Sequence, residues 1–128
     1  MKIGQTASFT KTITETDVYM FAGVTGDFNP VHVDAIQAKE SIFGERIAHG
    51  VLSSGLISAV LGMQLPGPGA ILSKLDLKFL APVKFNDTIT ATVTVRELLP
   101  ERKRVIMDCK ATNQDGKEVV QGESVLII

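Results

Sequence analysis

The fold is decided by residues 50–63, which read GVLSSGLISAVLGM. Almost every position in this stretch is apolar or small, and the cluster Pro66-Gly67-Pro68-Gly69 that follows stops a helix. A helix that is apolar on all sides needs burial on all sides. The stretch therefore predicts one long central helix that other elements surround.

Beyond residue 70 the apolar residues recur with a period of two. Four runs show the pattern of strands with one face in water: residues 74–79, 88–95, 104–111 and 119–128. Asp115-Gly116 between the last two runs is a typical hairpin turn. Three or four antiparallel strands need a cover for their apolar face, and the central helix provides it. The pattern predicts an α+β fold, an antiparallel sheet wrapped around one buried helix.

The chain before the central helix predicts two shorter helices. Thr14 and Asp17 resemble a capping box, and the apolar spacing behind them predicts a helix over about residues 15–24 that ends at Gly26. Asp34 is a suitable N-cap for a second, short helix.

Length and composition limit the class of function. The 128 residues fit one domain, predicted over residues 1–128, and a net charge of −1 gives no long-range field that would attract nucleic acid or an anionic membrane. The most apolar stretch is too polar to span a membrane. Cys109 is the only cysteine, which excludes an internal disulfide and favours a small buried side chain. We expect a cytoplasmic protein that binds neither nucleic acid nor membrane.

An aspartate and a histidine stand out in residues 25–32, which read TGDFNPVH. Their spacing of five is poor for a contact on one helix, and Pro30 disfavours helical angles at Asn29, so we expect a turn that leaves a helix. Such a turn can direct Asp27 and His32 at one point. The imidazole would then hold a water while the carboxylate takes its proton, which suits the addition of water to a polarised double bond.

The same segment also has a purely structural interpretation. Asp27 can cap the following turn, and His32 can be a buried histidine whose hydrogen bonds are satisfied. The spacing alone favours neither chemistry nor a metal, since the chain has only two histidines and no neighbouring cluster of ligands.

His49-Gly50 at the start of the central helix is the second feature of interest. Gly50 has no side chain, so a ligand can approach its N–H closely, and a helix N-terminus adds unpaired N–H groups and partial positive charge. Together these can receive the oxygen of a thioester as negative charge develops on it. Alternatively, Gly50 only lets the chain turn tightly into the helix. We expect His49 to be structural in either case.

Residues 21–34, FAGVTGDFNPVHVD, resemble the signature of the MaoC-like or (R)-specific enoyl-CoA hydratases, also called hydratase 2. The resemblance continues through residues 48–51 (AHGV), 57–62 (ISAVLG), 64–67 (QLPG) and 77–83 (LKFLAPV), and so covers nearly the whole chain. It implies the hot-dog fold and a homodimer with active sites near the subunit interface. It also implies reversible hydration of trans-2-enoyl-CoA to (R)-3-hydroxyacyl-CoA. No metal or redox cofactor is implied, coenzyme A being part of the substrate.

The resemblance also implies roles for individual residues. The family's catalytic aspartate, catalytic histidine and oxyanion-binding amide fall on Asp27, His32 and Gly50. Its substrate-binding positions fall on Asn29, on Ser58 near the acyl pocket, and on Leu61, which would set the chain length.

Two other functions stay open from the sequence. Thioesterases share the hot-dog architecture, but they commonly place a catalytic carboxylate on the central helix, and residues 50–63 contain none. A non-catalytic module that binds acyl-CoA is the other alternative. The length of the acyl chain, the carrier (coenzyme A or acyl carrier protein) and the direction of the reaction are not determined by the sequence.

Overall fold

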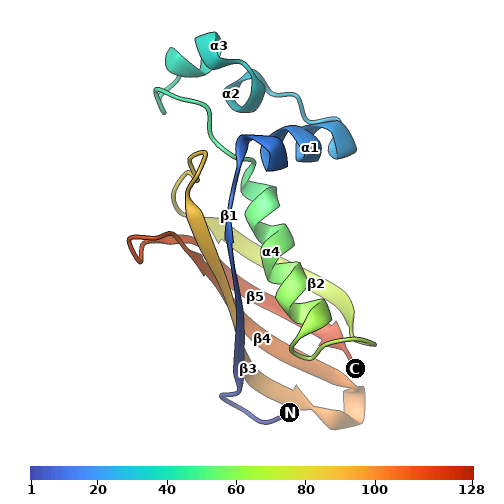
Figure 1. Cartoon of the computed structure of the whole chain (residues 1–128). Coiled ribbons are helices and arrows are strands. Elements are labelled where there is room, and N and C mark those ends of the chain that lie inside the picture. The colour runs from blue at the N-terminus through green and yellow to red at the C-terminus, as the bar shows by residue number, and fades with distance from the viewer.

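The computed structural model describes residues 1–128 as one curved antiparallel sheet with helices on its concave side and at one end (Figure 1). The elements in chain order are β1 (Thr6–Thr12), α1 (Glu15–Thr25), α2 (Pro30–Val33), α3 (Ala35–Lys39), α4 (Gly50–Met63), β2 (Ile71–Phe79), β3 (Thr88–Leu99), the short 3-10 helix Pro100–Arg102, β4 (Arg104–Thr112) and β5 (Glu118–Ile127). The strand order across the sheet is β1-β3-β4-β5-β2, and every neighbouring pair is antiparallel.

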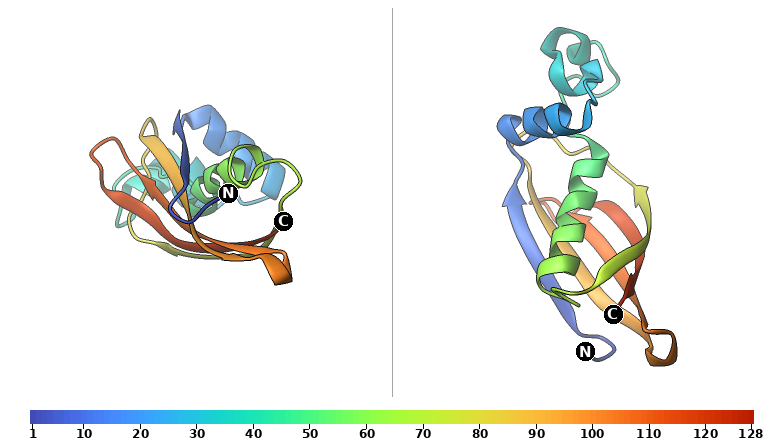
Figure 2. Two further views of the ribbon diagram at one scale, coloured as in Figure 1. Left: turned by 90° about the horizontal axis from the view of Figure 1, so that it is seen from below. Right: turned by 90° about the vertical axis from the view of Figure 1, so that its right-hand side faces the viewer.

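The predicted central helix is α4, which begins and ends at the predicted residues. It lies in the concave face of the sheet (Figures 1 and 2) and packs on β3, whose inward residues are almost completely inaccessible to solvent. The outward residues of β3 are the alternating threonines, as a strand with one wet face requires. These observations confirm the α+β prediction of a sheet wrapped around one helix, the hot-dog fold.

Two expectations about the sheet and its helix are wrong for the single chain. The sheet has five strands, because the polar segment Thr6–Thr12 also pairs, with β3. The helix α4 is not covered on all sides: Val51 is 60% exposed and Met63 is 74% exposed. Figure 2 (right) shows that no other element covers the outer side of α4. The apolar composition of α4 therefore exceeds what one chain buries.

The predicted helix ends before α4 are confirmed. Thr14 and Asp17 form a complete capping box at α1, and Gly26 ends the helix in the left-handed conformation with φ 83°. Asp34 caps α3 through its carboxylate. The segment around Pro30, expected as a turn, forms the single helical turn α2. Proline is tolerated there because it occupies the first position, where an N–H would have no intrahelical acceptor.

Helices α1, α2 and α3 gather at the end of the molecule where α4 begins (Figure 1). This arrangement brings the segment after α1 next to the first turn of α4.

Cys109 is buried in the sheet, and burial raises the pKa of its thiol, as expected for a packing residue and not for a nucleophile. None of the helices combines the length and the hydropathy needed to cross a membrane.

Candidate active site

Asp27 and His32 lie at the two ends of one short segment of the chain. Gly26 turns the chain out of α1, and Asp27 follows directly. Asn29 caps α2 by accepting the N–H of Val31 at 3.3 Å, and its own N–H donates to Asp27 Oδ1 at 3.2 Å. The local sequence thus holds the exposed carboxylate at the start of the turn and places His32 on α2. The side-chain oxygen of Asn29 is already hydrogen-bonded within this turn. The role of Asn29 in substrate binding stays a prediction.

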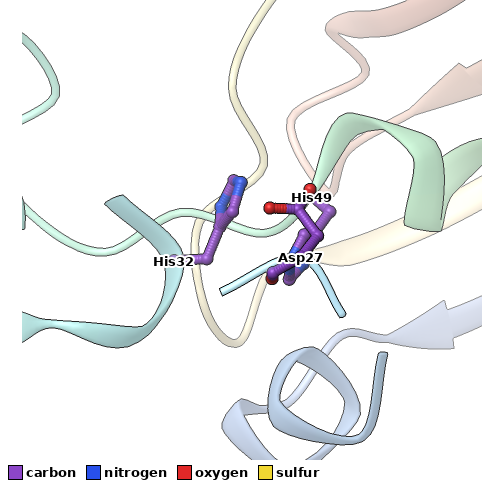
Figure 3. Close-up of side chains that lie close together, drawn as sticks. All are labelled: Asp27, His32 and His49. Atoms are coloured by element: carbon purple, nitrogen blue, oxygen red, sulfur yellow. The ribbon is translucent and has the colours of Figure 1, made fainter. Parts of the chain in front are cut away.

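The predicted pair does come together, and His49 joins it. One side-chain nitrogen or oxygen of each of Asp27, His32 and His49 lies within 4.8 Å of the others. Figure 3 shows the three side chains side by side, although they come from the loop after α1, from α2 and from the residue before α4. His32 and His49 are buried, while Asp27 is open to solvent. A small molecule can therefore reach the carboxylate with the imidazoles behind it.

A backbone hydrogen bond fixes the orientation of the His32 ring. Its Nδ1 lies 2.8 Å from the carbonyl oxygen of Ile47, which can only accept, so Nδ1 carries the hydrogen. In the neutral imidazole Nε2 then has the free lone pair, and it has no partner in the protein. This nitrogen can accept a hydrogen bond from a water that also touches the Asp27 carboxylate.

His49 connects both members of the pair. Its ring stacks on His32 with centroids 3.9 Å apart and an interplanar angle of 29°, and it also contacts Phe21 at 4.7 Å. Its Nε2 donates to the backbone carbonyl of Asp27 at 2.9 Å. These contacts are consistent with the structural role expected for His49. The sequence did not predict that His49 lies beside Asp27 and His32. Adjacency to Gly50 was the only signal in the sequence.

The three side chains are poorly arranged for a metal ion. Zinc ligands lie about 2.0–2.1 Å from the ion, so tetrahedral ligand atoms are roughly 3.3 Å apart and converge on one point. Stacked imidazoles direct their lone pairs side by side, and one nitrogen of each ring already donates to a carbonyl. The donor set therefore fits proton transfer better than metal binding.

The first turn of α4 offers free backbone donors. The N–H groups of Gly50 and Val51 have no acceptor in the protein, and His49 does not cap them with its side chain. Phe79 of β2 packs against Gly50, where a Cβ would meet the ring at 2.9 Å. A larger residue at this position would displace the Phe79 ring, a packing reason for glycine that neither interpretation of the sequence contained.

An apolar cavity of about 330 Å³ lies beside Gly50. Of its 12 lining residues 9 are hydrophobic, contributed by the segments around Ile47, Phe79 and Val119, and Gly50 and Ser53 of α4 complete it. Pockets of this size and composition suit small apolar ligands. A hollow of similar volume on the outer face of the sheet has no hydrophobic lining and is unsuited to an acyl chain.

The two acyl-pocket residues expected on α4 do not line this cavity. Ser58 is exposed on the open side of the helix, whereas Leu61 is buried in the core. Although they are three residues apart, they therefore face different surroundings, and their roles in substrate binding remain predictions.

Comparisons with known proteins identify the family of the chain and agree with its fold. Residues 1–119 match the family described as MaoC like domain. An (R)-specific enoyl-CoA hydratase of Rhodospirillum rubrum is 52% identical over 100% of this chain and 88% of its own length. A 3-hydroxybutyryl-CoA dehydratase of Methylorubrum extorquens is 45% identical over 99% of this chain and 80% of its own.

Solved structures give the same result. An R-hydratase from Pseudomonas aeruginosa in the unliganded form superposes with a TM-score of 0.94 at 46% identity, over 99% of this chain and 81% of that one. An (R)-hydratase from Aeromonas caviae involved in PHA biosynthesis has a TM-score of 0.96 at 35% identity, over 100% of this chain and 97% of that one. With its sequence matched over most of its length and its hot-dog fold shared with these hydratases, the chain belongs to the MaoC-like family.

Proposed function

We propose that this chain is an (R)-specific enoyl-CoA hydratase, a hydro-lyase that adds water to trans-2-enoyl-CoA and removes it in the reverse reaction. The observation that carries the proposal is the meeting of Asp27 and His32 within 4.8 Å, beside the free N–H of Gly50. The (R)-specific hydratase that is 52% identical over the whole chain supports the same reaction. A place in fatty-acid metabolism follows from this substrate class.

In the mechanism, water bridges the pair before it attacks. His32 Nε2 holds the water, Asp27 accepts its proton, and the resulting hydroxyl group bonds to C3 of the enoyl chain. Negative charge then develops on the thioester oxygen, where the Gly50 N–H can stabilise it. A proton from the pair returns to C2 and completes the addition of one water.

We further propose that the active form is a homodimer. The strand β2 lies at the edge of the sheet, and its apolar residues Ile71, Leu72 and Phe79 are exposed. The open side of α4 is apolar as well. An unpaired strand edge beside an exposed apolar face is typical of a surface that another chain covers. Sedimentation at micromolar concentration should therefore give a dimer, and a fully active monomer would refute this part.

The main competing reaction is hydrolysis of the thioester. Helix α4 carries no carboxylate that could serve a thioesterase. Incubation with a trans-2-enoyl-CoA distinguishes the alternatives: a hydratase removes the enoyl absorbance, releases no free thiol and gives the (R)-3-hydroxy product. Thiol release would support a thioesterase, and tight binding without either change would support a non-catalytic module.

The remaining parts of the proposal concern the cofactor and the cellular location of the enzyme. Coenzyme A is part of the substrate, and we propose that no separate cofactor is needed. We also propose a cytoplasmic location, which cell fractionation followed by the hydration assay would test.

A further inference from the structure

The side chain of Ser53 is unusual among the polar groups of the protein. The residue is only 1% exposed, and its Oγ has no hydrogen-bond partner. A buried hydroxyl without a partner destabilises the folded state, so native proteins rarely keep one unless something else binds to it. The only other buried side-chain nitrogen or oxygen without a partner is His49 Nδ1. Both unsatisfied atoms therefore belong to the start of α4.

The neighbouring serine shows that this state is not forced by the helix. Ser54 is also buried, but its Oγ donates to the carbonyl of Val51 at 2.6 Å, the usual way in which a helical serine satisfies itself. Ser53 has the same option and does not use it. Ser53 is one of the residues that line the apolar cavity beside Gly50, and no protein atom accepts the hydrogen of its buried hydroxyl.

Gly50 and Ser53 are placed to act on one ligand atom. Ser53 lies about one turn after Gly50, and helical side chains lean toward the N-terminal end, so Ser53 leans toward the turn that begins at Gly50. Both residues line the same cavity, and the Gly50 N–H is also free. A carbonyl oxygen has two lone pairs and can accept both donors.

We propose that Ser53 is a substrate-binding residue whose Oγ–H donates to the thioester oxygen of the bound acyl-CoA, together with the Gly50 N–H. This inference deepens the proposed hydration and rests on it. As water adds to C3, charge moves to the thioester oxygen, and a second donor held in an apolar cavity strengthens its stabilisation. The bound ligand also gives the Ser53 hydroxyl the hydrogen-bond acceptor that it lacks in the free protein.

Turnover of Ser53→Ala, with Ser54→Ala as the matched control, tests the proposal. Ser53→Ala should lower kcat/KM for enoyl-CoA hydration by about 10²-fold, the scale for one oxyanion donor. Its Tm should stay the same or rise, because an unpaired buried hydroxyl is removed. Ser54→Ala should keep kcat/KM within about 3-fold of the wild type, since only its bond to the helix backbone is lost. A Ser53→Ala enzyme whose hydration is also within that range would overturn the proposal.

Binding of two unreactive ligands separates this inference from the hydratase function. Butyryl-CoA has the thioester oxygen, whereas the thioether S-butyl-CoA lacks it. Calorimetry should show that Ser53→Ala weakens butyryl-CoA about 3- to 10-fold, the effect of one neutral hydrogen bond, and leaves S-butyl-CoA unchanged. If the wild type binds both but hydrates nothing, the proposed function fails while this difference still supports Ser53. Equal effects on the two ligands, or none, would overturn the role of Ser53 even in an active hydratase.

Discussion

Replacing His49 by phenylalanine separates the ring contacts of this side chain from its hydrogen bond. A phenyl ring preserves the stack on His32, at a centroid distance of 3.9 Å, but it cannot donate to the Asp27 carbonyl as Nε2 does at 2.9 Å. Losing that hydrogen bond costs about 0.5–1.5 kcal/mol, and removing the unpaired buried Nδ1 returns about 1–3 kcal/mol. The free energy of unfolding should therefore stay within about 2 kcal/mol of the wild type.

Activity should respond much more strongly than stability. The backbone of Asp27 loses the bond that ties it to the start of α4, and a displacement of about 1 Å at a reacting group can cost about 10²-fold in rate. We expect His49→Phe to lower kcat by about 10- to 100-fold with little change in KM. His49→Gln, which keeps an N–H donor, should recover part of that loss. Steady-state hydration kinetics and urea unfolding measure the two effects, and a wild-type kcat in folded His49→Phe would refute the positioning role.

Three further changes test other parts of the fold and the acyl pocket. Gly122→Ala should lower the free energy of unfolding by about 3 kcal/mol or more in urea, because its Cβ would overlap the backbone of β2; an unchanged midpoint would contradict the packing of β5 on β2. The Lys11 ammonium group holds the pKa of Asp17 below its usual value, so the pair adds stability above about pH 4 that is lost as pH falls through the lowered pKa. Asp17→Asn should remove that part of the acid dependence of Tm. Leu61→Ala should cost about 2–5 kcal/mol as a core truncation, and an unchanged preference among enoyl-CoA chain lengths in the folded variant would exclude Leu61 from the acyl pocket.

The sequence predicted α4 best, because its composition is apolar throughout and local chemistry defines its C-terminal end. The Gly/Pro cluster behind Met63 stops the helix whatever surrounds it, and alternation fixes the faces of β3 and β4 in the same way. Burial of α4 on all sides was predicted wrongly because composition shows how much apolar surface a helix has and not which chain covers it. Thr6–Thr12 was not counted among the predicted strands because only Ala7 and Phe9 alternate there with polar residues, which is too short an apolar pattern to identify a strand.

The site was predictable only where its residues are close in sequence. Asp27 and His32 share one turn, so the chemistry of Gly26 and Pro30 was enough to place them together. The contacts of His49 with this pair span 17 and 22 residues of chain and depend on how α1 packs on α4. Ser53 could not be distinguished from its neighbours, because the difference is a hydrogen bond that one hydroxyl makes and the other does not.

The most direct test of the central claim is hydration by Asp27→Asn. Asparagine keeps the size of the side chain and the oxygen that accepts the Asn29 N–H, so the turn and the Tm should change little. An amide cannot accept a proton at neutral pH, so loss of the base should lower kcat/KM by about 10²–10⁴-fold. His32→Gln should have a similar effect, and the double variant should be scarcely worse than either single one, since both groups act on one water. Near-normal hydration by well-folded Asp27→Asn would contradict the mechanism and leave residues 25–32 as a structural turn.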